Sequence, residues 1–212
     1  MKEDLHLSVE GHVKIWDPNT QEVFVDKRNA INAEVVSDLI AQAFAKEQYY
    51  YIFEMHFGNG GAIIDENGNI TYRDVYTNLD SGYQAGLFSP TYFKVVDETN
   101  TSDNDDPSRN NVISYHTEGL NYSDVVITCT LEGNQPNLAE TTRNLAGVPQ
   151  QSYDSATNFD GDFIFNEIGL KCNGPSGDLN MGHLMTHIVF HPVQKSANRV
   201  IQVVYTLRIR IV

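Results

Sequence analysis

The clearest pattern in the chain is a long alternation of apolar and polar residues near its end. Over residues 199–211 the apolar positions share one face of a strand: Ile201, Val203, Tyr205, Leu207, Ile209 and Ile211. The other face is mostly polar and carries Gln202, Thr206, Arg208 and Arg210. Since successive side chains of a strand point to opposite faces, the pattern predicts an antiparallel sheet with one buried face.

Two hairpins are predicted in the first third of the chain. Residues 11–26 form two alternating runs around a turn, 17–20, that has proline where a type I turn favours it. The dipeptide Asn67-Gly68 lies between two short runs rich in β-branched residues, a strong hairpin signal. Further strands are predicted over residues 50–57, 91–97, 112–117, 123–131, 163–168 and 183–190.

One amphipathic helix is predicted over residues 33–47. Asn32 is a suitable N-cap, and Glu34 lies in the first turn, where the helix dipole favours an acidic side chain. The apolar residues recur at helical spacing and comprise Val35, Val36, Leu39, Ile40, Ala43 and Phe44. We expect this stripe to pack on the core, and the alternative is a face that binds a partner.

These elements predict a single, mainly β domain over residues 1–212. After the helix, residues 49–212 read as strands interrupted by long polar loops near 98–111 and 132–162. The order of elements favours an antiparallel β-sandwich or jelly-roll-like core with the helix packed on it. Loops of this length usually bind something or lack order, so in an assembly they are candidates for arms over neighbouring subunits.

The composition limits the classes of partner. Of the 212 residues 41% are apolar and 20% charged, as in globular proteins. The net charge of −14 argues against sequence-independent nucleic-acid binding, which needs a basic surface. No segment approaches the roughly 20 apolar residues of a membrane helix, and no targeting peptide is visible. We therefore expect synthesis in the cytoplasm, and neither nucleic acid nor membrane as a partner.

The charge is unevenly distributed along the chain. Residues 171–212 contain five basic residues and one acidic residue, a local charge of +4, so the rest of the chain carries about −18. Such asymmetry can align neighbouring copies in a homo-oligomer, and the alternative is a chance excess of basic residues on one strand. The candidate subunit-contact residues are Lys195, Arg199, Arg208, Arg210, Asp103, Asp105 and Asp106.

Several side-chain patterns are considered as metal sites. His183, His187 and His191 are spaced by four, but the segment favours a strand, on which such residues lie about 13 Å apart and cannot share one ion. Asp65 begins a run similar to a calcium loop, but the glycine position and the closing glutamate do not fit. The acidic loop at 103–106 is a weak candidate for a divalent cation, and a solvated loop is favoured. We expect no metal and no cofactor.

Two side-chain pairs are considered as catalytic. Glu54 with His56 shares a strand face, and Asp124 is close in sequence to Cys129. Neither pair is accompanied by a nucleophile elbow, a phosphate-binding loop or a metalloprotease motif, so we do not expect an enzyme. Cys129 lies on the apolar face of its strand and is predicted to be a buried, reduced thiol.

Four blocks of the chain resemble virion structural proteins of contractile-tailed bacteriophages, including phages of cyanobacteria. They are GHVKIWDPNTQEVFVDKRNAI (11–31), YIFEMHFGNGG (51–61), FNEIGL (165–170) and HPVQKSANRVIQVVYTLRIRI (191–211). FNEIGL is also similar to a strand found in several phage tail and fibre-attachment proteins. The resemblance implies a many-copy ring or shell component of the virion with no catalytic residues, whose partners are copies of itself and portal, neck, tail or capsid proteins.

The sequence leaves open where in the virion such a component lies. The first hypothesis is a ring component of the neck, collar or head-to-tail connection, and the second is a capsid decoration protein. A third, from a different class, is a host-glycan or receptor-binding tail module in which Tyr49, Tyr50, Tyr51 and Trp16 stack on sugars. Against the third stands the expectation that these aromatic residues fill the core.

Overall fold

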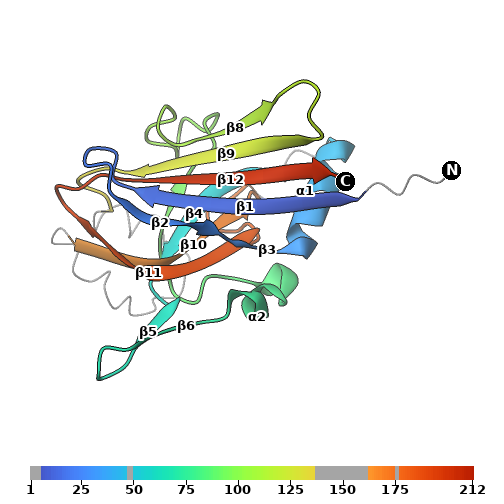
Figure 1. Cartoon of the computed structure of the whole chain (residues 1–212). Coiled ribbons are helices and arrows are strands. Elements are labelled where there is room, and N and C mark those ends of the chain that lie inside the picture. The colour runs from blue at the N-terminus through green and yellow to red at the C-terminus, as the bar shows by residue number, and fades with distance from the viewer. Residues whose placement is uncertain (1–5, 47–49, 137–161, 175–176) are drawn as a thin grey trace.

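The computed structural model describes residues 6–46, 50–136, 162–174 and 177–212 (Figure 1). Strands make up 49% of the chain and helices 12%, and the prediction of a mainly β, antiparallel, sandwich-like fold is confirmed. The first five-stranded sheet has the order β2 (Val23–Arg28), β1 (Leu7–Trp16), β12 (Ile201–Ile211), β9 (Tyr122–Leu131), β8 (Asn111–His116). The second has the order β3 (Ala30–Ile31), β11 (Thr186–Ser196), β10 (Asp162–Cys172), β4 (Ile52–Gly58), β7 (Pro90–Val95).

The core lies between the inner faces of the two sheets. On β12 the predicted alternation is observed, with Ile201, Val203 and Tyr205 fully buried and Leu207 5% exposed. The second sheet contributes aromatic rings: Phe165 packs edge-on against Phe57, with 5.4 Å between the ring centroids. Such pairs bury large apolar areas and add specific ring–ring contacts. The sandwich is therefore held by alternate residues of both sheets.

Both predicted hairpins are present. In the β1–β2 turn, Asp17 Oδ1 accepts a hydrogen bond from Asn19 N at 2.8 Å. The Asn67-Gly68 turn joins β5 (Ala62–Ile64) to β6 (Ile70–Tyr72), with Gly68 at φ +83°, a conformation that glycine adopts without strain. In Figure 1 the β5–β6 hairpin projects from the sandwich at the lower left.

Helix α1 (Ala33–Ala45) begins at the predicted cap, where Asn32 Oδ1 accepts from Val35 N. The segment in which the helix was expected to end, 47–49, lies outside the described residues. Val35 is buried, but Phe44 is 89% exposed. The expectation that the whole apolar stripe packs on the core is wrong for its last turn, because the core contacts Val35, Val36, Leu39 and Ile40 but does not reach Phe44.

The segment between β4 and β7 covers the outer face of the second sheet, an arrangement that the sequence did not predict. It contains the β5–β6 hairpin, α2 (Val75–Leu79) and the 3-10 helix η1 (Gly82–Gln84). Leu79 packs with Ala30, Ala85 and Leu184 in a small second core. The second sheet is thus buried on both faces, and polar residues on its outer face are enclosed.

The loop between β7 and β8 is fixed by buried side chains of its own chain. Lys94, 5% exposed, donates from Nζ to Asp105 Oδ2, Thr130 O and Gln135 Oε1 at 3.0, 3.1 and 2.8 Å. Asn104, also buried, donates to the carbonyl oxygens of Asp97 and Asn110. This loop therefore has a defined conformation without a neighbouring subunit. Most of the second predicted loop, 137–161, lies outside the described residues.

Candidate functional site

The outer face of the second sheet carries a buried glutamate–histidine pair on β4. Glu54 and His56 are 1% and 2% exposed, and Glu54 Oε2 lies 2.7 Å from His56 Nε2. The His56 ring stacks on Phe93 with 5.0 Å between centroids, and Glu54 Oε1 accepts from Asn180 N at 2.7 Å. The two residues share a strand face as expected, and the structure shows that this pair is buried.

A second pair, Glu167 on β10 and His187 on β11, is also fully buried. Glu167 Oε2 accepts from His187 Nε2 at 2.9 Å and from Phe88 N at 3.0 Å, and Glu167 Oε1 accepts from Gly60 N at 3.0 Å and Ser89 N at 2.8 Å. All four partners are donors, which matches an ionised carboxylate. Both ends of the β4–β7 segment are therefore bonded to one side chain of the sheet.

The protonation of His187 follows from its second neighbour. The side-chain amide of Asn78 lies 3.0 Å from His187 Nδ1, and the same Nδ2 group donates to Gly86 O. An amide N–H can only donate, so Nδ1 accepts and Nε2 carries the proton shared with Glu167. The imidazole is thus neutral and held from both sides. This arrangement fixes α2 and the following turn on the sheet.

Lys171 lies next to the Glu54–His56 pair. It lies opposite Glu54 in the β10–β4 register, and its Nζ donates to the backbone and side-chain oxygens of Asn180 at 3.2 Å. Burial lowers the pKa of Lys171. Burial also lowers the pKa of His56 below its ordinary value of 6.5, and the Lys171 ammonium acts in the same direction. His56 is consequently neutral at neutral pH, an expected form for a buried imidazole.

The space beside His56 is filled. A Cβ atom added at Gly169, which lies opposite His56, would come within 2.6 Å of Thr186 O and 3.2 Å of a Leu87 methyl group. A substrate would need to displace the covering segment to reach either imidazole. The chemistry that the geometry supports is structural: each carboxylate collects backbone N–H groups from a covering loop and satisfies a buried histidine.

The three histidines considered as a metal site are not brought together. His187 is buried against Glu167, His191 is exposed, and the ring of His183 packs edge-on against Tyr83 at 4.6 Å. Across the described part of the chain, no cluster of three or more histidine, cysteine, aspartate or glutamate side chains is placed to hold a metal ion. Asp124, the other acidic residue considered for catalysis, bonds Arg208 through both carboxylate oxygens, each at 2.8 Å. Cys129 is buried as expected, and burial raises its pKa to about 12.

The basic candidates for subunit contact differ in exposure. Lys195 is 1% exposed, and its Nζ donates to the carbonyl oxygens of Gly133 and Ser196, each at 3.0 Å. Its position as a surface contact is therefore a wrong expectation, and burial lowers its pKa to about 8. Arg208, besides its bonds to Asp124, lies over the Tyr122 ring at 4.0 Å. Of these two basic residues, Lys195 is buried and Arg208 is paired within its own chain.

The remaining candidates keep more of their charge at the surface. Arg199 lies at the β1–β2 turn, 3.7 Å from a Glu22 oxygen, and Arg210 lies 5.7 Å from the Tyr122 ring. The acidic candidates bond mainly within their own loop. Asp103 accepts from Asn100 and Ser102, Asp105 accepts from Lys94, Asn110 and Gln135, and Asp106 accepts from Ser108.

The aromatic residues proposed for sugar stacking do not form one platform. Tyr51 packs edge-on against Phe53 at 6.0 Å, and its hydroxyl accepts from Asn173. Trp16 lies at the end of β1 with Lys14 Nζ 5.0 Å from its ring. Tyr49 lies outside the described residues. The rings of Tyr51 and Trp16 are thus occupied by contacts of their own chain, and they lie at strands of different sheets.

Comparisons with protein families, with curated proteins and with solved structures found no match to this chain. Among the residues that the structure describes, no helix is long and apolar enough to cross a membrane. The resemblance to phage virion proteins therefore stays a prediction from the four sequence blocks.

Proposed function

We propose that this chain is a non-enzymatic structural subunit of a contractile-tailed phage virion, present in many copies as a ring component of the neck, collar or head-to-tail connection. The observation that carries the proposal is the division between buried ionisable groups and exposed apolar ones. Both glutamate–histidine pairs are enclosed and bond covering loops, whereas large apolar side chains lie in water. Such exposed apolar surface is typical of sites that another protein covers.

The exposed apolar residues occur on two projecting parts of the molecule. One is the β5–β6 hairpin, where Ile63, Ile64 and Tyr72 are 52%, 59% and 50% exposed. The other is the end of the sandwich at which both α1 and the C-terminus lie (Figure 1), with Phe44 and Val212 89% and 61% exposed. Each buried Å² of such surface contributes roughly 25 cal/mol, so its burial in a neighbour favours assembly.

Two alternatives within the virion make different predictions about location. A capsid decoration protein would lie on the head surface, and a receptor-binding module would lie at a fibre or baseplate. The contacts of Tyr51 and Trp16 within their own chain favour the structural roles over sugar binding.

The experiment is complementation of a phage that lacks this gene, followed by mass spectrometry and antibody labelling of purified particles. We expect the wild-type chain to be incorporated and the label to lie between head and tail. Phe44→Ser should lower incorporation, whereas Ser37→Ala on an exposed site of the same helix should not. Label on the head surface or on fibres would support an alternative, and a chain absent from particles would refute the proposal.

A further inference from the structure

Three of the sheet edges carry features that oppose pairing with another strand. β2 ends in three consecutive charged residues, 26–28. The second sheet ends in β3, which pairs with only two residues of β11; beyond β3, Lys27 Nζ donates to Val189 O of β11 at 2.8 Å, and the β10–β11 register shifts around Pro192. β7 begins at Pro90 and is almost wholly buried. Charges, prolines and bulges are the usual means by which proteins prevent edge-to-edge association.

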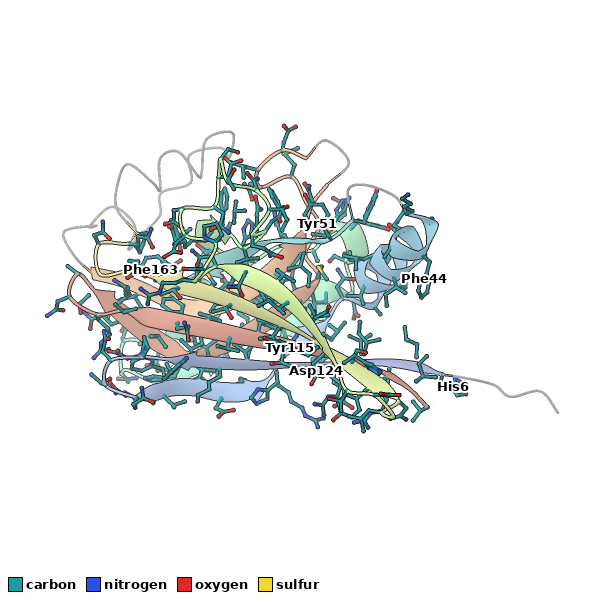
Figure 2. The ribbon with its side chains drawn as sticks, turned by 90° about the horizontal axis from the view of Figure 1, so that it is seen from above. His6, Phe44, Tyr51, Tyr115, Asp124 and Phe163 are labelled. Atoms are coloured by element: carbon teal, nitrogen blue, oxygen red, sulfur yellow. The ribbon has the colours of Figure 1, made fainter. Side chains whose placement is uncertain are left out.

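The fourth edge, β8, has only one such feature, a bond from Val112 N to the Glu98 carboxylate. Its sequence is Asn-Val-Ile-Ser-Tyr-His, with no proline and no acidic residue, lysine or arginine, and its register with β9 is regular. Ile113 and Tyr115 are 43% and 54% exposed on the outer face of the sheet. Figure 2 shows Tyr115 beside Asp124 of the neighbouring strand. Among the described residues, β8 is therefore the least protected of the four edges.

The backbone of β8 presents hydrogen-bonding groups outward. Val112 N donates to Glu98 Oε2 at 3.0 Å and so points away from β9. In an antiparallel ladder successive residues alternate, so Ser114 and His116 point the same way, while Ile113 and Tyr115 bond β9. Within the described residues, the outward backbone groups of Ser114 and His116 have no protein partner. Unpaired groups of this kind are a template for another strand.

We propose that β8 pairs antiparallel with β8 of a second copy of this chain, with Ser114 opposite Ser114 of the partner subunit on a two-fold axis. Each Ser114 then donates to and accepts from the other, as in a hydrogen-bonded pair. The first sheets of the two copies become one continuous sheet across the axis. This contact is isologous, because the same strand is used by both copies.

This register is self-complementary on the outer face. It places Ile113 opposite Tyr115 of the partner subunit, and Tyr115 opposite Ile113 of the partner subunit. Both are non-hydrogen-bonded positions of the new ladder, where facing side chains approach most closely. Aromatic and β-branched residues form favourable cross-strand pairs. The exposed apolar area of β8 is thus covered by the same area of the partner subunit.

The charges near the edge also fit a second copy. A chain of net charge −14 repels its copies, but β8 itself carries no acidic residue. The register places His116 opposite Val112 of the partner subunit, next to the partner's Glu98. When Val112 N enters the new ladder, the released Glu98 carboxylate can accept from that imidazole. Two such acid–imidazole contacts, related by the axis, replace the Glu98–Val112 bond of each separate chain.

The inference deepens the proposed structural role by naming one contact and its partner. A cyclic ring also requires a heterologous contact, so β8 pairing joins copies across a two-fold axis in addition to the ring contact. A six-residue edge is a small interface, and many-copy assembly strengthens a weak contact of this kind.

The test is sedimentation of the purified full chain from about 1 µM to about 1 mM, the range of weak association. We expect a reversible dimer. Ser114→Pro removes an outward N–H without affecting the ladder to β9, and should weaken dimerisation at least about tenfold with unchanged circular dichroism. Ser114→Thr keeps the N–H and should dimerise like the wild type.

Register and pairing have separate readouts. The Ser114 and His116 amides should gain protection from hydrogen exchange with rising concentration, and the Ile113 and Tyr115 amides should not change. Ile113→Glu and Tyr115→Lys should each weaken the dimer, and the double variant should restore it by bringing opposite charges together. A wild-type chain monomeric at the highest concentration, or a Ser114→Pro dimer of wild-type affinity, would overturn the inference. Neither result bears on particle incorporation, which tests the proposed function separately.

Discussion

Replacement of Glu167 by glutamine tests whether the buried glutamate–histidine pairs stabilise the fold. The carboxylate accepts four hydrogen bonds, from Gly60 N, Ser89 N, Phe88 N and His187 Nε2, and is fully buried. A glutamine offers one oxygen and one NH₂ group, so two of the four donors then face a donor. His187 cannot adapt by changing tautomer, because its Nδ1 accepts from Asn78.

The magnitude follows from those two donors, which lose their acceptor. Each buried donor left without an acceptor costs about 1 to 3 kcal/mol, so the two together cost about 2 to 6 kcal/mol. For a chain of this size, each kcal/mol shifts the melting temperature by about 2 to 4 °C, so a decrease of about 4 to 24 °C is expected. Thermal and urea unfolding followed by circular dichroism would measure it, and limited proteolysis should show cleavage within residues 59–89.

The matched control is Glu66→Gln on the exposed turn of the β5–β6 hairpin, which should change stability by less than about 0.5 kcal/mol. A Glu167→Gln protein within about 1 kcal/mol of the wild type would refute the view that this carboxylate fixes the covering segment. A variant that retains its stability but loses a measured turnover would instead indicate a catalytic role for the pair.

Three further predictions concern buried groups. The folded-state pKa of His56 is lowered, so as the pH falls the unfolded state binds a proton before the folded state does. The free energy of unfolding should therefore decrease as the pH drops below about 6.5. His56→Gln should flatten this dependence in urea titrations at pH 7.5 and 5.5. Lys94→Met removes the donor to the buried acceptors Thr130 O and Gln135 Oε1 and should cost about 1 to 3 kcal/mol, with faster amide exchange in the 98–110 loop. Cys129 and Cys172, whose pKa values are raised by burial, should react with Ellman's reagent in urea and not in the native protein; rapid native reaction would contradict their burial.

Local patterns allowed much of the fold to be predicted. Strand β12 was predictable because alternation is set by neighbouring residues, and the β5–β6 hairpin because Asn-Gly selects one turn. Phe44 was misjudged because helical spacing shows which face is apolar but not where the covering sheet ends. The covering of the second sheet by the β4–β7 segment was not predicted, because its short helix, α2, has too few residues for a periodic pattern.

The polar pairs depend on contacts distant in sequence. Glu167 and His187 are 20 residues apart and meet only when β10 and β11 pair, and the backbone donors to Glu167 lie a further 78 to 107 residues away. The burial of Lys195, in contrast, could have been predicted from the sequence. It lies two residues after Val193, which is buried, so strand alternation places both side chains on the same enclosed face.

The central claim is that the exposed apolar surfaces of this chain are buried against other virion subunits. Electron cryo-microscopy of intact particles tests it most directly. The account predicts many copies of the two-sheet sandwich between head and tail, with the β5–β6 hairpin and Phe44 covered by neighbouring chains. Particles that contain no density for this fold, or that hold it with both apolar parts in solvent, would contradict the account.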